Sequence, residues 1–415
     1  MRCLPFDRKK LEELSSKWPT PFYIYDAKAI RENAERLKKA FSWNKGFREY
    51  FAVKANPNAQ LMKLLRTCGF YSDCSSLAEL VLAEKVGNVG DKIMFTSNDT
   101  PAEEFRKAME LGAIVNLDDI THWEALLEAA GRPAEIMCCR YNPGPLKGGN
   151  SIIGKPEEAK YGMTKEQIFS CYEKMRDFGV KRFGIHTMVA SNELNPDYIV
   201  DTADMLFSLA VEIHERLGID FEFVNIGGGI GIPYKPGEQA MDLEYTGIKI
   251  EECYRRRISG RAMKDIALYM ECGRCITGPY GYLVSKVIHF KDTYRKYAGL
   301  DACMSNLMRP AMYDAYHEIV VPGKENFPRK AIYDVTGSLC ENNDKFAVRR
   351  ELPLLEKGDF VVICDAGAHG HAMGFQYNGK LRSAEILLEE DGSVREIRRA
   401  EILDDYFATQ NFNGL

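Results

Sequence analysis

The sequence lacks long apolar runs, low-complexity tracts and a strong excess of charge of either sign. No window approaches the roughly 18 apolar residues that a membrane-spanning helix requires, and residues 1–26 become charged and helical too early for a secretory signal. The net charge of -5 argues against nucleic acid as the main partner. We therefore expect a soluble cytoplasmic protein that binds neither a membrane nor nucleic acid.

A zinc-finger spacing is also missing, although the chain has 12 cysteines. Cys272 and Cys275 form a C-x-x-C pair, but no second pair or His-x-x-x-His follows at a suitable distance. Cys138 and Cys139 lie in a predicted strand, where adjacent side chains point to opposite faces. So many cysteines without a secretory signal indicate reduced thiols in a cytosol. We expect no structural metal site.

Short apolar segments alternate with amphipathic helices from Phe22 to about Gly278. Leucine and alanine recur at i, i+3 and i+4 in the helical segments 27–41, 76–87 and 195–218. Eight strand–helix repeats predict a closed (β/α)8 barrel rather than the alternative, an open doubly wound sheet. The eight predicted strands span residues 49–55, 69–74, 92–97, 113–117, 135–142, 181–189, 221–229 and 266–273.

After about residue 280 the pattern changes to an alternation with a period of two, broken by Gly and Asp turns. This pattern predicts a mostly β second domain. No Pro/Ser-rich linker marks the boundary between the halves. We expect a barrel domain over residues 26–278, and a β-rich domain formed by residues 1–25 and 279–415.

The stretch EYFAVKANPN, residues 49–58, places Lys54 where a buried strand gives way to a turn. A lysine in such a place is either a reactive amine or a side chain that extends outward to water. Its position alone favours the second alternative. The other strand ends are needed to decide.

A barrel enzyme carries its site on the loops at the carboxyl ends of the strands. A lysine beside cationic groups is nucleophilic toward an aldehyde. A glycine run lets backbone N–H groups bind a phosphate. An acid opposite a pyridine nitrogen keeps that nitrogen protonated. Each feature alone is more often a tight turn or an ion pair. Their coincidence indicates a phosphorylated cofactor bound through a Schiff base. The strand-end residues are Lys54, Asp73, Arg140, Asn142, His186, Gly227, Gly228, Gly229, Glu271 and Arg274.

With these residues the sequence resembles the alanine-racemase-fold, pyridoxal phosphate (PLP)-dependent decarboxylases, and most closely the diaminopimelate decarboxylases, over nearly the whole chain. The resemblance implies a barrel followed by a β domain, and PLP held by Lys54 in the motif at residues 50–56. It also implies that the family's E-P-G-R appears as Glu271-Cys272-Gly273-Arg274, with the acid at the pyridine nitrogen and the arginine at the substrate. The remaining cofactor contacts that it implies are Asp73, Arg140, His186, Ser191, Gly227, Gly228, Gly229, His369 and Tyr377.

The second domain matches two further stretches of the family. RPAMYDAY implies that Arg309 and Tyr313 contact the distal carboxylate of the substrate, and the resemblance also implies a substrate contact for Tyr377. GSLCENNDKF implies that Cys340 is a catalytic proton donor and that Glu341 binds the distal ammonium group. In the family this loop reaches the neighbouring subunit, which implies a homodimer with two shared sites. The alternative for Cys340 is a buried structural thiol, but the polar run at 341–344 argues against it.

The chain departs from the family pattern at three positions. Met188 stands where a histidine usually stacks on the PLP ring, and a thioether packs on an aromatic face without forming the hydrogen bonds of imidazole. His369 replaces the usual tyrosine at the phosphate and retains a donor. Cys272 replaces the proline of E-P-G-R. These departures bear more on the substrate than on the cofactor.

The activity that the resemblance implies is decarboxylation of meso-diaminopimelate at its D-centre, which gives L-lysine and CO2 in the last step of lysine biosynthesis. Decarboxylation of another basic or carboxyalkyl amino acid, of the ornithine, lysine or carboxynorspermidine type, is the alternative on the same scaffold, as is a racemase. A small, non-catalytic PLP-binding barrel protein is a further alternative, but such proteins lack the second domain that this chain has. A phosphate-sugar barrel enzyme without PLP is the alternative outside this family.

Overall fold

The computed structural model describes residues 3–150, 152–261 and 263–414. It forms two compact units: the barrel unit (Arg31–Ile232 and Gln239–Ile276) and the β unit (Met1–Ile30, Pro233–Glu238 and Thr277–Leu415). Pro233–Glu238 therefore belongs with the β unit, although the sequence placed it inside the barrel domain. The reason is local, because the Tyr234 ring packs 5.1 Å from the ring of His317, a residue of the β unit.

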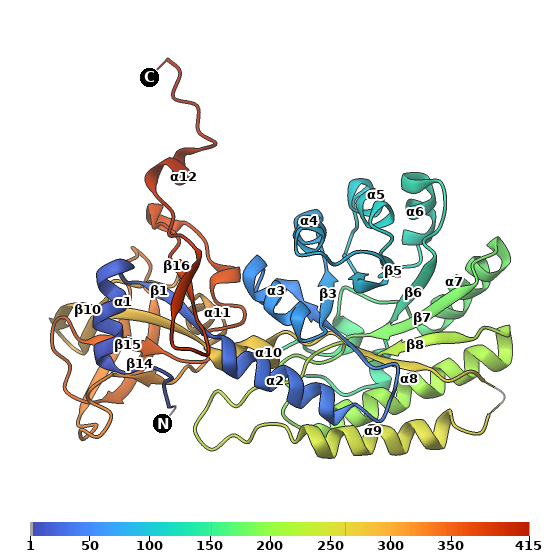
Figure 1. Ribbon diagram of the computed structural model, residues 1–415, viewed down its shortest axis with the longest axis horizontal. Helices are drawn as coiled ribbons and strands as arrows, with labels where there is room; N and C mark the ends of the chain where they lie inside the picture. The colour runs from blue at the N-terminus through green and yellow to red at the C-terminus, as the bar shows by residue number, and fades with distance from the viewer. Residues whose placement is uncertain (1–2, 151, 262, 415) are drawn as a thin grey trace. The chain divides into compact units, whose positions relative to one another are not determined.

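Eight parallel strands close into a barrel in chain order, which confirms the predicted fold and excludes the open sheet (Figure 1). The strands are β2 (Arg48–Ala52), β3 (Tyr71–Cys74), β4 (Ile93–Phe95), β5 (Ile114–Leu117), β6 (Ile136–Tyr141), β7 (Arg182–Thr187), β8 (Phe221–Asn225) and β9 (Ala267–Met270). Their inward side chains form an apolar cluster that includes Tyr50, Met94 and Phe223. This cluster fills the barrel, so polar chemistry is left to the strand ends.

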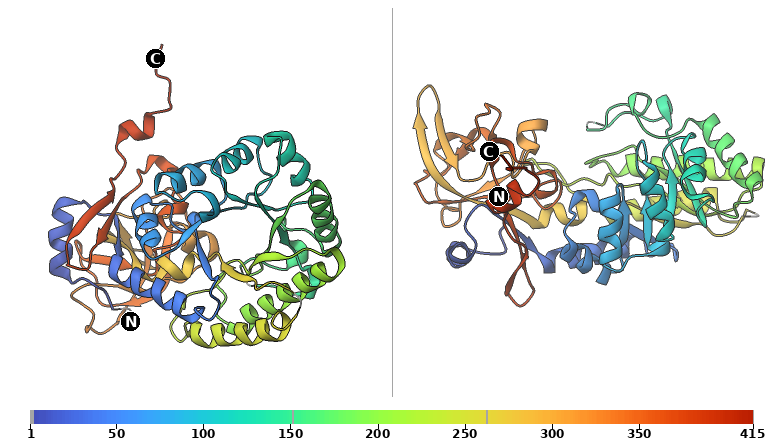
Figure 2. Two further views of the ribbon diagram at one scale, coloured as in Figure 1. Left: turned by 45° about the vertical axis from the view of Figure 1, so that its right-hand side comes forward. Right: turned by 90° about the horizontal axis from the view of Figure 1, so that it is seen from above.

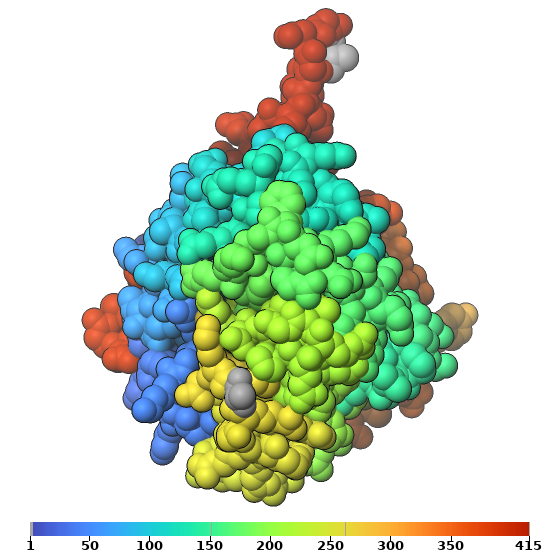
Figure 3. Space-filling model, turned by 90° about the vertical axis from the view of Figure 1, so that its right-hand side faces the viewer, coloured from blue at the N-terminus to red at the C-terminus, as the bar shows by residue number. Residues whose placement is uncertain are grey.

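Helices surround these strands, as the left view of Figure 2 shows. Side chains of α7, α8 and α9 (green to yellow) form part of the face seen in Figure 3. The helices are α2 (Ala27–Ala40), α3 (Ala59–Thr67), α4 (Leu77–Lys85), α5 (Ala102–Glu110), α6 (His122–Ala130), α7 (Lys165–Phe178), α8 (Pro196–Leu217), α9 (Leu243–Arg257) and the short α10 (Arg274–Thr277). Local chemistry sets their ends: Thr164 and Gln167 form a capping box at the start of α7, and Gly179 ends that helix with φ 111°. The segments predicted as helices lie within two residues of α2, α4 and α8.

The predicted alternation of Cys138 and Cys139 is confirmed. Cys138 belongs to the apolar cluster inside the barrel. Cys139 faces the helical layer, with its Sγ 3.6 Å from Sγ of Cys171 on α7. Among the described residues, no group of three or more His, Cys, Asp or Glu side chains is arranged to hold a metal ion.

Strand β2 is shorter than predicted. It ends at Ala52, and Val53–Ala55 forms a single 3-10 turn, η1, that is closed by the bond from the N–H of Asn56 to the carbonyl of Val53 (3.0 Å). Lys54 therefore lies on a turn beyond the strand rather than inside it. The chain leaves the strand early because the turn residues Asn56 and Pro57 follow at once.

The β unit contains a nine-stranded sheet, which confirms the mostly β second domain (Figure 1). Strand β1 lies in its middle, antiparallel to β10 and parallel to β16, and α1 contributes Leu11 and Leu14 to the core on one face. The strands are β1 (Phe22–Asp26), β10 (Gly281–Asp292), β11 (Lys296–Leu300), β12 (Ile319–Val320), β13 (Ala331–Thr336), β14 (Lys345–Leu352), β15 (Phe360–Ile363), β16 (Ala384–Leu388) and β17 (Val394–Arg398), with helices α1 (Arg8–Lys17), α11 (Arg309–Tyr313) and α12 (Leu403–Phe407). Across the described part of the chain, no helix has both the length and the apolar character needed to cross a membrane.

Candidate active site

Glu271 is the central acid at the mouth of the barrel. It follows β9 and is buried, and its carboxylate accepts hydrogen bonds from Nδ2 of Asn225 (2.7 Å) and from Nε2 of His186 (3.1 Å). Burial alone raises the pKa of Glu271, but the imidazole of His186 and the Asn225 amide outweigh that effect, so the pKa is lowered. Glu271 is therefore an ionised carboxylate in a site that is shielded from water.

His186 is fixed by a chain of hydrogen bonds through the barrel wall. The amide nitrogen of Asn116 lies 2.9 Å from Nδ1 of His186 and 2.9 Å from Oγ1 of Thr96. With the amide as donor, Nδ1 accepts and Nε2 carries the hydrogen that is donated to Glu271. His186 thus orients the acid. Neither Asn116 nor Asn225 was predicted to belong to the site. Asn116 lies near the end of the predicted strand 113–117, and Asn225 lies in the middle of the predicted strand 221–229 but ends β8.

Lys54 and Asp73 lie within electrostatic reach of Glu271. The Asp73 carboxyl, on β3, is buried, and burial together with the negative charge of Glu271 raises its pKa well above the usual range, although the Lys54 ammonium opposes this. Its Oδ1 has no hydrogen-bond partner among the described residues. The environments of Glu271 and Asp73 therefore shift the pKa values of the two carboxyl groups in opposite directions, down for Glu271 and up for Asp73.

The glycine run after β8 packs tightly against its neighbours. A Cβ on Gly227 would collide with the carbonyl of Thr187, and one on Gly228 would collide with the carbonyl of Glu271. A Cβ on Gly229 would lie 2.6 Å from the carbonyl oxygen of Ala190. Only glycine lets the backbone approach this closely. We call this tightly packed run, which is the predicted phosphate contact, the glycine cradle.

Met188 contacts this glycine run. Its sulfur lies 3.3 Å from the backbone nitrogen of Gly228 and accepts the N–H of that residue, while the N–H of Gly227 is accepted by Oδ1 of Asn225 (2.9 Å). The thioether therefore lies at the edge of the cradle. Nearby, the N–H of Ser191 donates to Oδ1 of Asn150 (3.2 Å), which ties the loop after β7 to the loop after β6.

The two polar residues at the end of β6 differ in role. Nη1 of Arg140 donates to Asp118 (3.1 Å), while its buried Nε has no partner among the described residues. Asn142 instead bonds to the carbonyls of Pro156 (2.9 Å) and Tyr161 (3.1 Å), so it organises its own loop. Arg140 remains a candidate for ligand binding, and Asn142 has a structural role.

These residues fit pyridoxal phosphate. The barrel mouth offers an exposed lysine amine, an ionised buried carboxylate for a pyridine N–H, a glycine cradle for a phosphate, and an unpartnered Nε on Arg140. The helix α10 begins at Arg274, which is half-buried beside this mouth.

The remaining predicted residues lie in the β unit. Arg309 on α11 is buried, whereas Tyr313 and Tyr377 are 59% and 50% exposed. Cys340 is exposed, which confirms that it is not a buried structural thiol. Glu341 and His369 are partly buried, and His369 has the left-handed φ of 53°.

Two residues that the sequence analysis missed fix the Cys340 loop. Oδ1 of Asn378, in the turn η7 (Tyr377–Gly379), accepts the N–H of Cys340 (2.7 Å). The carboxylate of Asp344 accepts the N–H groups of Leu339 (2.8 Å) and Met304 (2.6 Å). The loop is thus held from both sides while the thiol is left exposed.

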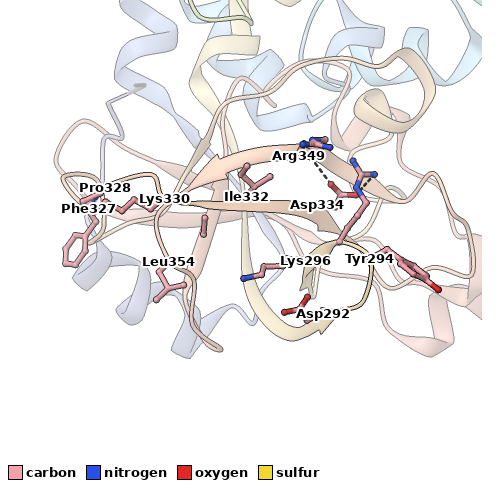
Figure 4. Close-up of a pocket in the computed structure, with 12 residues that line it drawn as sticks. Asp292, Tyr294, Lys296, Phe327, Pro328, Lys330, Ile332, Asp334, Arg349 and Leu354 are labelled. Atoms are coloured by element: carbon pink, nitrogen blue, oxygen red, sulfur yellow. Dashed lines mark hydrogen bonds and ion pairs between the residues drawn. The ribbon is translucent and has the colours of Figure 1, made fainter.

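A groove of about 800 Å³ on the β unit contains none of the predicted site residues (Figure 4). It lies along β11, β13 and β14 and mixes apolar side chains, such as Phe327 and Leu354, with charged ones. Arg295 pairs with Asp334 at 3.0 Å inside it. Its lining contains neither a cysteine nor a histidine, so we place the chemistry at the barrel mouth instead.

The fold and the barrel-mouth site define a PLP-dependent enzyme of the barrel-plus-β-domain class. Residues 27–278 match the family described as pyridoxal-dependent decarboxylase, pyridoxal binding domain. The chain belongs to this family of carboxy-lyases, and its cofactor is pyridoxal phosphate.

Relatives match over nearly the whole chain. Protein TabA of Pseudomonas amygdali pv. tabaci is 42% identical over 95% of this chain and 92% of its own length. The diaminopimelate decarboxylase of Methanothermobacter thermautotrophicus is 34% identical over 96% of this chain and 93% of its own. Among solved structures, the diaminopimelate decarboxylase of M. jannaschii superposes with a TM-score of 0.89 at 30% identity, covering 97% of this chain and 94% of the other.

Proposed function

We propose that the protein removes the carboxylate at the D-centre of meso-diaminopimelate and releases L-lysine and CO2. The observation that carries this proposal is the buried, ionised Glu271, held by His186 and Asn225 on the same barrel mouth as Lys54. The diaminopimelate decarboxylases among the relatives support the substrate. One of these structures, from Helicobacter pylori, is described as a complex with L-lysine.

Pyridoxal phosphate, when bound, supplies an electron-withdrawing ring that takes up the electron pair left behind by CO2. In this chain Lys54 would hold it covalently, Glu271 would keep its ring nitrogen protonated, and Gly227–Gly229 would bind its phosphate. Met188, whose sulfur accepts the N–H of Gly228, would add a polarizable thioether to the residues that hold the cofactor.

Four side chains would bind the distal end of the substrate. Arg274, Arg309 and Tyr313 would bind the distal carboxylate, and Glu341 the distal ammonium. Cys340, or Lys54, would then deliver a proton to Cα. A diamine precursor such as ornithine needs only an acid at its far end and offers no second carboxylate that two arginines could bind. The arginines therefore favour a dicarboxylate over the alternative substrates.

A substrate panel tests this function. Purified protein supplied with PLP should release CO2 from meso-diaminopimelate and form L-lysine, whereas L-lysine and ornithine should be decarboxylated poorly. If a simple diamino acid reacts faster, the protein is a different decarboxylase on this scaffold. If the protein neither releases CO2 nor shows visible-range cofactor absorbance, the result would support the alternative of a phosphate-sugar barrel enzyme without PLP.

Glu341→Gln should lower kcat/KM for meso-diaminopimelate by about ten- to a hundredfold. A charge-assisted hydrogen bond is worth roughly 1.5 to 3 kcal/mol, and its loss leaves the distal ammonium poorly paired. Steady-state kinetics of CO2 release measures the change. Glu351→Gln is the matched control, since Glu351 is an exposed acid on β14. Equal rates for Glu341→Gln and native protein would remove Glu341 from the ammonium site.

We further propose a cytoplasmic homodimer whose sites are shared between subunits. The exposure of Cys340 supports the dimer, and the twelve free thiols support a reducing compartment. Mixing inactive Lys54→Ala protein with inactive Cys340→Ala protein should restore part of the activity, because one hybrid site receives both native residues. Activity after subunit exchange, verified by mass spectrometry, is the readout. No recovery would mean that Cys340 acts within its own chain or not at all.

A further inference from the structure

Arg309 is held in the β unit by two residues to which no role has been given, His317 and Tyr234. The guanidinium is buried, with Nη1 2.8 Å from Nε2 of His317. Its Cζ lies 4.4 Å from the centre of the Tyr234 ring. Tyr234 follows the glycine run in the sequence, and its ring also packs against the imidazole of His317, at 5.1 Å and 64°.

The hydrogen-bond directions fix the state of His317. Arginine only donates, so Nε2 of His317 accepts and carries no hydrogen. Nδ1 therefore carries the hydrogen and donates it to the carbonyl of Cys364 (2.8 Å). His317 is fully buried, so its ring has no room to reorient.

The contacts with a neutral imidazole and an aromatic face orient the guanidinium, and neither of these two groups carries a negative charge. A carboxylate in the place of His317 would form an ion pair and weaken the attraction of Arg309 for an anionic ligand. These contacts therefore suit an arginine that must present its positive charge to a carboxylate. The same contacts fix the fork of donors that a carboxylate accepts in pairs.

We propose that His317, supported by Tyr234, is a positioning residue that aims Arg309 at the distal carboxylate of the substrate. This inference rests on the proposed function, because it assigns Arg309 to that carboxylate. His317 acts through Arg309 and touches no reacting atom. Its removal should therefore reduce affinity for ligands that carry the distal carboxylate, and leave other ligands unaffected.

Two ligands that differ only in this group make the test. L-Lysine, the proposed product, retains the carboxylate of the unreacted end, and cadaverine is the same diamine without it. Binding of each to the PLP-loaded protein is measured by spectral titration and calorimetry. His317→Phe keeps a ring but lacks the acceptor; His317→Gln restores an acceptor. His289→Phe, at an exposed histidine of β10, is the matched control.

His317→Phe should weaken L-lysine binding about tenfold and change cadaverine binding less than about twofold, because one oriented charge-assisted contact is lost. His317→Gln should recover most of the affinity for L-lysine, and His289→Phe should behave as native protein. If His317→Phe does not fold, His317→Asn makes the same comparison, because its amide still reaches Cys364 but is too short for Arg309. Equal losses for both ligands, or no loss, would overturn the positioning role. Native protein that binds cadaverine as tightly as L-lysine would instead refute the carboxylate site at Arg309.

Discussion

Lys54→Ala should abolish nearly all turnover, with kcat/KM at least about a thousandfold below that of native protein, because a covalent catalyst has no substitute for its amine. The turn η1 presents this amine beyond the end of β2, within electrostatic reach of Glu271 and Asp73. Borohydride reduction of native protein should attach the cofactor to the peptide that contains Lys54. Mass spectrometry of the digested protein identifies that peptide.

Lys63→Ala is the control for this change, since Lys63 is an exposed lysine on the next helix, α3. It should retain native kinetics and native labelling. A label on another lysine, or full turnover in Lys54→Ala, would refute the assignment. Either result would also return Lys54 to the alternative of a side chain that merely extends to solvent.

Glu271→Gln should lower kcat by about a hundred- to a thousandfold, or about 3 to 4 kcal/mol of transition-state stabilisation. The amide keeps the shape of the side chain but lacks the negative charge that holds a ring proton. KM should change less than kcat, because Glu271 faces the cofactor rather than the distal end of the substrate. Stopped-flow and steady-state assays separate the two quantities.

The pH dependence of stability gives a second measurement on Glu271. Its pKa is lowered in the folded protein, because the bonds from His186 and Asn225 outweigh burial. Its contribution to stability is thus full above the unfolded pKa of about 4.3 and is lost as the pH falls through the folded value. Relative to native protein, Glu271→Gln should be less stable near pH 7, and the difference should shrink in acid. A constant difference in thermal midpoint would contradict this, and Glu128→Gln, at an exposed acid of α6, is the control.

Periodicity was sufficient to predict the barrel, because eight apolar strands buried on both faces differ sharply from the amphipathic helices around them. It was not sufficient to locate the end of β2, since Val53 and Ala55 suit a strand as well as the turn that they form. The sequence pattern also did not indicate that Tyr234 belongs to the β unit. Its packing on His317 joins segments more than eighty residues apart, and no local pattern reports such a contact.

Some residues of the candidate site could likewise be predicted from the sequence, and others could not. Lys54 and Glu271 stand out from sequence because a charge at the end of an apolar strand needs an explanation. Asn116 and Asn225 do not, since an amide in a strand is compatible with many environments and only the tertiary hydrogen bonds to His186 and Glu271 reveal its role. Asn378 was missed for a similar reason, because it meets Cys340 across 38 positions of sequence.

The tight packing of the glycine run bears on how such an enzyme changes its substrate. Gly227–Gly229 press against the backbone of the loops after β7 and β9, so a side chain introduced there would displace main chain rather than a movable neighbour. Cys340 itself is exposed, so a change of side chain at this position displaces no main chain of the described residues. Substitutions at the exposed substrate-facing position are therefore tolerated more easily than substitutions in the glycine cradle. Substrate specificity can change in this way while the cofactor-binding residues stay the same.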